Sequence, residues 1–358
     1  MKHSWWLATA YLGAVIGAGF ASGQEIVQFF VCYGPQGQAG AVLATALFAL
    51  AGAALMWLAG KKGFSHYQDV LRFTLGPRLG RLVDLLLAGF LFVGVSTMLS
   101  AAGAIFSEHF YLPAGRGVLL TFALVLVLLF RGYQGLMLAY GLLVPVKIAL
   151  LMGISAWAAF FIDPAAVPAQ YGGALMPDPQ SWLPAALLYV AYNFALAMVI
   201  LTEYQRPGKM RAGVAGAALG GLLLGVIVLI NYAALSRFLP AVLHYEVPML
   251  YVCGNISLTV KHVYCAVLWL GILTTALANA FGFAQRLSGH GFISYRAALI
   301  GGLVLSLPLA LQSFSGLVGK IYPLFGLLGI IILTALFIKV IAEAAKSLRQ
   351  KKLWKKAS

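Results

Sequence analysis

The sequence predicts an all-α, polytopic membrane protein with about ten transmembrane helices, arranged as two five-helix halves of opposite orientation. Three observations predict this fold class: an apolar composition, ten apolar runs of spanning length, and a similarity between the first and sixth runs. Of the 358 residues, 62% are hydrophobic and 9% are charged, with a mean hydropathy of +0.94. Soluble domains have close to a quarter of charged residues, so this composition indicates a chain that lies in a bilayer.

The apolar runs are each long enough, or nearly so, to cross the hydrocarbon core as a helix. They cover 5–31, 38–60, 82–106, 117–130, 135–161, 182–204, 212–235, 259–285, 296–313 and 320–345. The fourth is short. The first is too long for the core of a signal peptide and is predicted to stay as a retained span. We therefore expect one transmembrane domain over 1–358, with half-repeats at about 5–161 and 182–345.

Three segments outside the spans also carry a structural prediction. The stretch HYQDVLRFTLG (66–76) has helical spacing and is expected to lie along the inner membrane interface. The stretch FLPAVLHYEVPML (238–250) is apolar enough to fold back into the protein as an outer lid. The basic tail at 346–358 is expected to be a solvated helix end near anionic headgroups.

The distribution of Lys and Arg predicts the orientation. The net charge of +15 could suggest a nucleic-acid partner, but the basic residues lie in short loops between spans, which excludes that class. With the N-terminus inside, nineteen Lys and Arg residues fall on the cytoplasmic side and four on the outer side, while Lys147 belongs to neither. The positive-inside rule therefore predicts that both termini lie on the cytoplasmic side of the membrane.

The first span contains the unusual stretch AYLGAVIGAGFASGQEI (10–26), with Gly13, Gly17, Gly19 and Gly23 followed by Glu25. Each glycine costs a helix about 1 kcal/mol relative to alanine. A broken helix in a membrane is tolerated only where it lines a protein cavity, and its freed backbone groups attract ions and charged solutes. The alternative is that the glycines form two small-residue packing faces on an unbroken helix.

An alignment of the first span with the sixth favours the broken helix. YLGAVIGAGFASGQE (11–25) aligns with YVAYNFALAMVILTE (189–203), so that Tyr11 matches Tyr189 and Glu25 matches Glu203. Two five-span halves of opposite topology with paired broken helices are typical of inverted-repeat transporters. We therefore predict a second break around Asn193, Phe194 and Ala195, facing the first break at mid-membrane.

The stretch GAVIGAGFASGQE resembles the start of the YkvI-like bacterial membrane proteins, a branch of the amino acid–polyamine–organocation superfamily. The resemblance implies the LeuT fold, with substrate held between the first and sixth helices. The residues that it implies are Gly17, Ala18, Gly19 and Phe20 on the first helix, and Asn193 to Ala197 on the sixth. It implies no particular substrate.

Lys147 lies near the middle of the fifth span, in GLLVPVKIALLMG. An ammonium group at that depth costs at least about 2.5–3.5 kcal/mol and must face a partner or a cavity. It could form a structural ion pair, with Glu25 as partner. In proton-coupled relatives of the superfamily a fifth-helix lysine occupies the place of sodium, and Lys147 resembles that lysine. Because burial favours the neutral amine, such a group can exchange a proton.

Hydroxyl groups in the eighth span leave sodium open as the coupling ion. Thr274 and Thr275 are similar to the pair that completes the sodium site of LeuT-like proteins, although membrane threonines often bond back to their own helix. If they line that site, an ammonium at Lys147 would exclude sodium. We therefore expect proton coupling and no bound cofactor.

Several further side chains are candidates for the pocket. Glu25, about 9 Å of helical rise beyond Gly19, could bind a substrate amine, act as an outer gate or pair with Lys147. Ser96 and Thr97 of the third span are candidate walls. The three cysteines show no metal or redox spacing and are expected to be free thiols. The residue pattern of an enzyme active site is absent from the sequence.

We therefore predict a secondary transporter of a small amine-bearing or amino-acid-like solute, coupled to protons and independent of sodium. The alternatives are a sodium-coupled symporter of the same fold, and a ligand sensor of this fold that does not transport. A channel is disfavoured because no repeated pore-lining ring is present. The sequence leaves open the solute, the stoichiometry, the direction and the oligomeric state.

Overall fold

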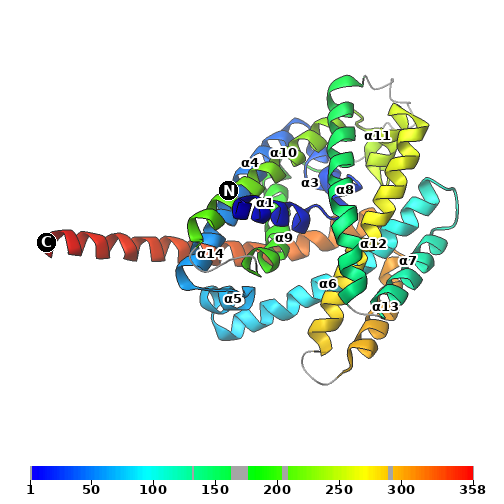
Figure 1. Ribbon diagram of the computed structural model, residues 1–358. Helices are drawn as coiled ribbons and strands as arrows, with labels where there is room; N and C mark the ends of the chain where they lie inside the picture. The colour runs from blue at the N-terminus through cyan, green and yellow to red at the C-terminus, as the bar shows by residue number, and fades with distance from the viewer. Residues whose placement is uncertain (1, 131–132, 163–175, 204–208, 289–292, 358) are drawn as a thin grey trace.

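The computed structural model describes residues 2–130, 133–162, 176–203, 209–288 and 293–357, and these residues are almost entirely helical (Figure 1). All ten predicted spans correspond to helices. The first span is divided into α1 (Lys2–Val15), α2 (Ala18–Ala21) and α3 (Gln24–Phe29). The other nine are α4 (Pro35–Lys62), α6 (Pro77–Glu108), α7 (Ala114–Leu129), α8 (Tyr133–Phe161), α9 (Trp182–Glu203), α10 (Met210–Ser236), α12 (Leu258–Ser288), α13 (Tyr295–Ala310) and α14 (Phe314–Ala357).

Among the described residues, six helices are long and apolar enough to cross a membrane, and three shorter apolar helices accompany them. Glycine and proline mark several of the helix ends. Gly34 precedes Pro35 at the start of α4, where the fixed φ of proline suits the first helical turn. The same helix ends at Gly63, which has a φ of 74° and occupies the left-handed conformation that glycine adopts without strain.

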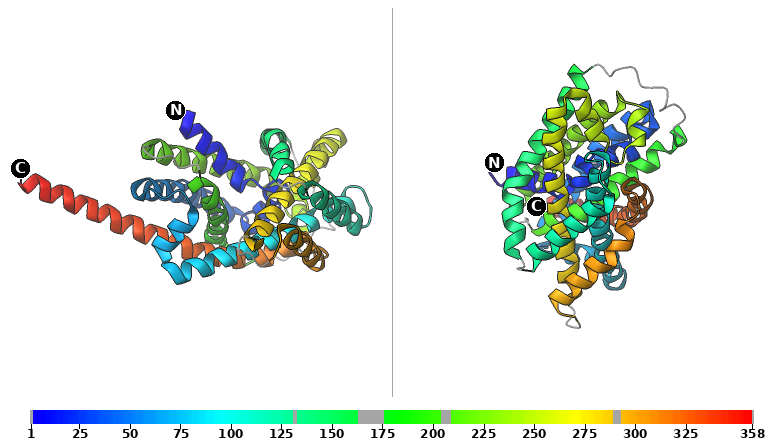
Figure 2. Two further views of the ribbon diagram at one scale, coloured as in Figure 1. Left: turned by 60° about the horizontal axis from the view of Figure 1, so that its bottom comes forward. Right: turned by 90° about the vertical axis from the view of Figure 1, so that its right-hand side faces the viewer.

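The helices contact one another in equivalent ways in the two halves of the chain. Helix α1 packs on α10, and its counterpart α9 packs on α4; likewise α6 packs on α7, and α12 packs on α13. The counterparts α4 and α10 also pack directly against each other, and so do α6 and α12. Figures 1 and 2 show segments from both halves interleaved rather than lying in separate lobes. These paired contacts agree with two halves related by an inverted repeat.

The contact between α4 and α10 depends on small residues. A Cβ atom at Gly221 would lie 2.5 Å from the backbone of Phe48, and one at Gly225 would lie 2.3 Å from the Thr45 side chain. The backbones approach closely because α10 has glycine at both places, as is common where helices associate in membranes. This contact holds the two halves of the chain together behind α1.

Of the three segments predicted outside the spans, those at 66–76 and 238–250 both form helices. The stretch 66–76 contains α5 (Tyr67–Leu75), which confirms a helix there; its place at the membrane interface stays a prediction. The stretch 238–250 contains the 3-10 helix η4 (Ala241–His244) and leads into α11 (Pro248–Ile256). Phe238, Val242 and Met249 are buried, so this segment does fold back into the protein as predicted.

Two carboxylates hold this lid segment against its neighbours. Glu108, at the end of α6, accepts hydrogen bonds from the backbone N–H groups of Glu246 (2.6 Å) and Val247 (3.1 Å). The Glu246 carboxylate in turn accepts bonds from the backbone N–H and the hydroxyl group of Ser315 at the start of α14. Charged acceptors make stronger hydrogen bonds than neutral ones, so the lid is firmly tied to both helices.

Helix α14 continues to Ala357, and Figure 1 shows its C-terminal part extending away from the rest of the protein. Lys61 and Lys62 at the end of α4 form ion pairs with Glu343 of α14, at 3.2 and 3.0 Å. Because α14 continues to Ala357, the predicted basic tail is helical as far as that residue. Its contact with headgroups stays a prediction. Cys32, Cys253 and Cys265 are all buried and free, as expected.

Candidate functional site

The first span is interrupted between α1 and α2, as its glycines predicted. Helix α1 ends at Val15, and the backbone N–H of Gly17 turns back to the Val15 carbonyl at 2.7 Å. Gly17 itself is extended, with φ −79° and ψ −175°, and α2 begins at Ala18. The N–H groups of Ala18 and Gly19 have no acceptor among the described residues, because the preceding helical turn is missing.

A second interruption follows at Gly23, and it changes the position of Glu25. Gly23 has a φ of 84°, and a Cβ atom there would lie 2.9 Å from Cγ of Met249 in α11. The chain therefore changes direction between α2 and α3. As a result, Oε1 of Glu25 lies 2.2 Å from the position that a Cβ of Gly19 would take. The predicted 9 Å helical separation between these residues is wrong, because the span is not one helix here.

Residues of α12 and α11 bond to the backbone of this double break. The hydroxyl group of Tyr264 in α12 donates to the Ala21 carbonyl at 2.6 Å, and the backbone N–H of Met249 donates to the Ser22 carbonyl at 2.9 Å. The Ser22 hydroxyl donates to the Gly19 carbonyl at 2.7 Å. Backbone carbonyls that the break leaves free are thus satisfied within the protein, as they must be at membrane depth.

The predicted second break is wrong. Helix α9 is continuous from Trp182 to Glu203 and passes through Asn193, Phe194 and Ala195 without interruption. It contains no glycine after Trp182, and the Asn193 amide group donates to the carbonyl of Tyr189 at 3.0 Å within the same helix. A helix of good helix formers whose polar side chain bonds to its own turn has no reason to unwind. The helices of the second half thus pack like those of the first half, but the sixth span has no break equivalent to the one at Gly17.

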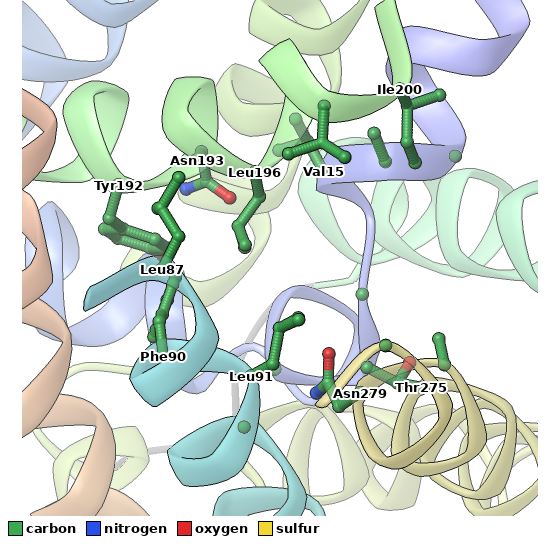
Figure 3. A pocket seen from close by; sticks show the side chains of 18 of the residues that line it. Val15, Leu87, Phe90, Leu91, Tyr192, Asn193, Leu196, Ile200, Thr275 and Asn279 are labelled. Carbon is green, nitrogen blue, oxygen red and sulfur yellow. The ribbon is translucent and has the colours of Figure 1, made fainter. Parts of the chain in front are cut away.

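A cavity of about 670 Å³ lies between the first break and the helices α6, α9 and α12 (Figure 3). This volume is in the range of sites for small molecules. Its lining includes the first break, Glu25, one face of α9, and residues of α6, α12 and α14. Those that the argument uses are Gly17, Ala18, Gly19, Glu25, Phe90, Tyr192, Asn193, Thr274, Thr275, Asn279, Arg286 and Tyr322.

Glu25 is the acidic side chain that the first span contributes to this cavity. It is 5% exposed, and its Oε2 accepts a hydrogen bond from the Tyr192 hydroxyl at 2.7 Å. No ion pair joins Glu25 to any residue whose side chain is described. Burying a carboxyl group at membrane depth is costly, so its presence here indicates a function.

Tyr192, which donates to this carboxyl group, packs against two further aromatic rings. The ring centroids of Tyr192 and Tyr322 are 5.2 Å apart, and Phe90 lies 6.1 Å from the first and 5.7 Å from the second. All three residues line the cavity, from α9, α14 and α6 respectively. Figure 3 shows Tyr192 and Phe90 together on one side of it, with Leu87 beside them. This part of the cavity therefore consists of one acidic group and an aromatic and apolar wall.

The cavity lining also has a polar part. Gln68 of α5 and the exposed Gln285 of α12 belong to it, together with Tyr67 and Arg286. The Arg286 guanidinium donates to the Tyr67 hydroxyl, lies 5.2 Å from the centre of that ring, and pairs with Asp84 at 3.9 Å. The Tyr67 hydroxyl also donates to Asp84. The interactions among Tyr67, Asp84 and Arg286 therefore link α5, α6 and α12.

The remaining candidate residues divide by position. Thr274 and Thr275 line the cavity, but both hydroxyl groups donate to the Gly271 carbonyl, at 2.8 and 2.9 Å. Ser96 and Thr97 are buried behind the wall of α6, where their hydroxyl groups donate to the carbonyls four residues earlier. Phe20, Phe194 and Ala195 are buried away from the cavity lining. Lys147 lies in α8, and its side chain is outside the described residues.

The aromatic wall was not predicted from the sequence. Tyr192 adjoins the candidate Asn193 and aligns with Ala14 in the comparison of spans, which gave no reason to select it. Tyr322 belongs to a span without any candidate, and Phe90 lies in the third span, where only the hydroxyl residues Ser96 and Thr97 were candidates. Aromatic residues are frequent throughout this chain, at 13%, so composition could not single out three of them.

Comparison with solved structures places the architecture in a known class. The transporter Mhp1 in an inward-facing conformation is 19% identical, with a TM-score of 0.61 over 94% of this chain and 76% of that one. Mhp1, a nucleobase-cation-symport-1 family transporter, in a closed conformation with bromovinylhydantoin bound is 18% identical, with a TM-score of 0.55 over 92% and 77%. A manganese transporter of Eremococcus coleocola is 11% identical, with a TM-score of 0.57 over 94% and 86%. The chain thus has the polytopic, LeuT-like fold that the sequence predicted.

Sequence comparison identifies the family. The uncharacterized membrane protein YkvI of Bacillus subtilis (strain 168) is 30% identical over 335 residues, which are 93% of this chain and 95% of YkvI. The uncharacterized protein YyaD of the same strain is 27% identical over 330 residues, covering 91% and 94%. No family model matches the chain. The chain is a membrane protein and belongs to the family of YkvI; its place in the larger superfamily stays a prediction.

Proposed function

We propose that this protein is a secondary active transporter of a small amine-bearing or amino-acid-like solute. The observation that carries the proposal is the buried carboxyl group of Glu25 inside a 670 Å³ cavity, next to the broken first span. A membrane protein tolerates both an irregular backbone and an acidic group at this depth where they serve a binding site. The likeness to solved transporters supports the same reading.

We propose that the cavity opens at one end only in this structure, and that this end faces the cytoplasm. The opening lies by Gln285 and Arg286 at the end of α12, which the loop charges assign to the inner side. At the opposite end, α11 and the lid are bonded to the first span and to α6. We place the protein in the bacterial plasma membrane with both termini inside.

For the coupling ion we propose a proton carried by Lys147. Its ammonium group would hold the broken first helix, α8 and α12 together, and loss of the proton would release them and let the inner half open. Such a step couples proton movement to solute release, because the two protonation states favour different conformations. Sodium is the competing proposal. The hydroxyl groups of Thr274 and Thr275 donate to the Gly271 carbonyl, and this leaves the lone pairs of both hydroxyl oxygens free to coordinate a cation.

Uptake into proteoliposomes tests this function. With a solute found by its effect on the melting temperature of the purified protein, uptake should proceed without sodium and rise with an inward proton gradient. Lys147→Ala should abolish the effect of the gradient. Lys320→Ala is the matched control, because Lys320 is an exposed lysine of α14 that does not line the cavity.

Two results would contradict parts of the proposal separately. Uptake driven by sodium in the unmodified protein, or a pH response that survives in Lys147→Ala, would refute the proton mechanism and leave the binding site standing. Binding of a solute that never accumulates in the vesicles, under any ion gradient, would refute transport and favour a sensor.

A further inference from the structure

We infer that the cavity takes a cationic amine that has an apolar body and no carboxylate, with its ammonium group at Glu25. This inference rests on the proposed function and narrows it, since it excludes amino acids as the preferred solutes. It is carried by three features of the cavity: its charges, the occupation of the first break by the protein's own carboxyl group, and the aromatic wall.

The charged groups among the described lining residues provide one site for a cation and no free site for an anion. Among the described residues that line the cavity, Glu25 and Arg286 are the charged ones. Arg286 is already bonded to Tyr67 and paired with Asp84. Because these two partners already satisfy the guanidinium group, Arg286 is not a free site for the carboxylate of a solute.

The backbone at the break offers no place for a solute carboxylate either. Freed N–H groups, such as those of Ala18 and Gly19, are the groups that would attract one. Yet Oε1 of Glu25 lies directly against Gly19, within 2.2 Å of a Cβ position there. A second carboxylate would meet like charge at a short distance in a site with little water to screen it. An ammonium group at the same place would instead gain an opposite charge.

The aromatic wall suits the rest of such a solute. Cations bind favourably over aromatic rings, so Tyr192, Tyr322 and Phe90 can stabilise the ammonium group from the sides that Glu25 leaves uncovered. Leu87, Leu91 and Leu196 extend the wall along the cavity, as Figure 3 shows. An apolar body placed there is removed from water. The volume has room for an amine of the size of phenethylamine.

Matched pairs of compounds test the inference on the unmodified full-length protein in detergent or nanodiscs. Each pair is an amine and the amino acid that differs from it by a carboxylate: phenethylamine with phenylalanine, tyramine with tyrosine, and isoamylamine with leucine. Binding is measured by calorimetry and by the shift in melting temperature at one pH. We expect each amine to bind at least tenfold more tightly than its amino acid. 2-Phenylethanol, which lacks the charge, should bind as weakly as the amino acids.

Variants then locate the amine. Glu25→Gln should weaken amine binding at least thirtyfold and leave the binding of 2-phenylethanol unchanged. Tyr192→Phe, a milder change, should weaken amine binding by three- to tenfold, because the carboxyl group loses its hydrogen bond. Asp178→Asn is the control, since Asp178 is an acidic residue outside the cavity that caps the exposed helix η3 (Pro179–Ser181). It should bind every compound like the unmodified protein.

The outcomes separate this inference from the function on which it rests. Amino acids that bind as tightly as their amines would overturn the inference and keep the transporter, and would indicate a carboxylate partner such as Lys147. 2-Phenylethanol binding as tightly as phenethylamine would overturn the role of Glu25. Failure of all the amines and all the amino acids to bind would overturn both the inference and the proposed solute class.

Discussion

Replacing Gly19 by alanine tests whether the fold of the first span exists to hold Glu25 in place. The added Cβ would lie 2.2 Å from Oε1 of Glu25, against 3.4 Å for an ordinary contact, so the carboxyl group must move by about 1.2 Å. Such a shift breaks the 2.7 Å bond from Tyr192. Hydrogen bonds to charged groups contribute about 1.5–3 kcal/mol, and alanine returns about 1 kcal/mol through its helix propensity. We expect a net loss of about 0.5–2 kcal/mol.

A double-mutant cycle measures this effect without any solute. Gly19→Ala should lower the melting temperature in the unmodified protein and should be neutral or stabilising in Glu25→Ala, where the space beside Gly19 is free. Residues in direct contact typically show coupling energies of 0.5–3 kcal/mol, so roughly that range is expected here. Gly13→Ala is the matched control, because Gly13 also lines the cavity and a Cβ there has nothing within 4 Å.

The same variant should also weaken solute binding. Displacing the carboxyl group by more than 1 Å should reduce the affinity for a cationic amine by about ten- to a hundredfold, which corresponds to about 1.4–2.8 kcal/mol. Calorimetry on the purified protein measures this change. Equal destabilisation by Gly19→Ala with and without the Glu25 side chain would refute the contact, and affinity equal to that of Gly13→Ala would refute its part in binding.

Three further substitutions test other parts of the structure by melting temperature. Gly23→Ala forces a side chain into a backbone with φ 84° and should lower the free energy of unfolding by about 1–2 kcal/mol. An unchanged melting temperature would contradict the interruption at Gly23. Tyr264→Phe removes the bond to the Ala21 carbonyl and should cost about 1 kcal/mol, and a neutral result would mean that this carbonyl finds another donor. Gly221→Ala should separate α10 from α4 and destabilise the protein, whereas Gly301→Ala, with nothing within 4 Å, should not; equal effects would refute the close packing.

The sequence alone determined the number, type and approximate limits of the helices. Ten apolar runs correspond to ten spans because a bilayer requires about twenty apolar residues in a helix, whatever the tertiary packing. The break at Gly17 was predictable for a related reason: glycines that weaken a helix were followed by a polar pair inside an apolar run. The lid at 238–250 could likewise be recognised from an apolar loop that would not remain in water.

Only the tertiary structure decided how these parts form a site. The bend at Gly23 packs against Met249, which is more than two hundred residues away, and beyond this bend Glu25 lies against Gly19. The alignment that pointed to a break at Asn193 compared residues by position, but α9 lacks the glycines that would weaken it and stays continuous. Tyr192, Tyr322 and Phe90 meet because three helices cross at one point. A pattern along the chain reports local backbone preference and burial, whereas a cavity is formed by side chains whose proximity depends on packing between distant helices.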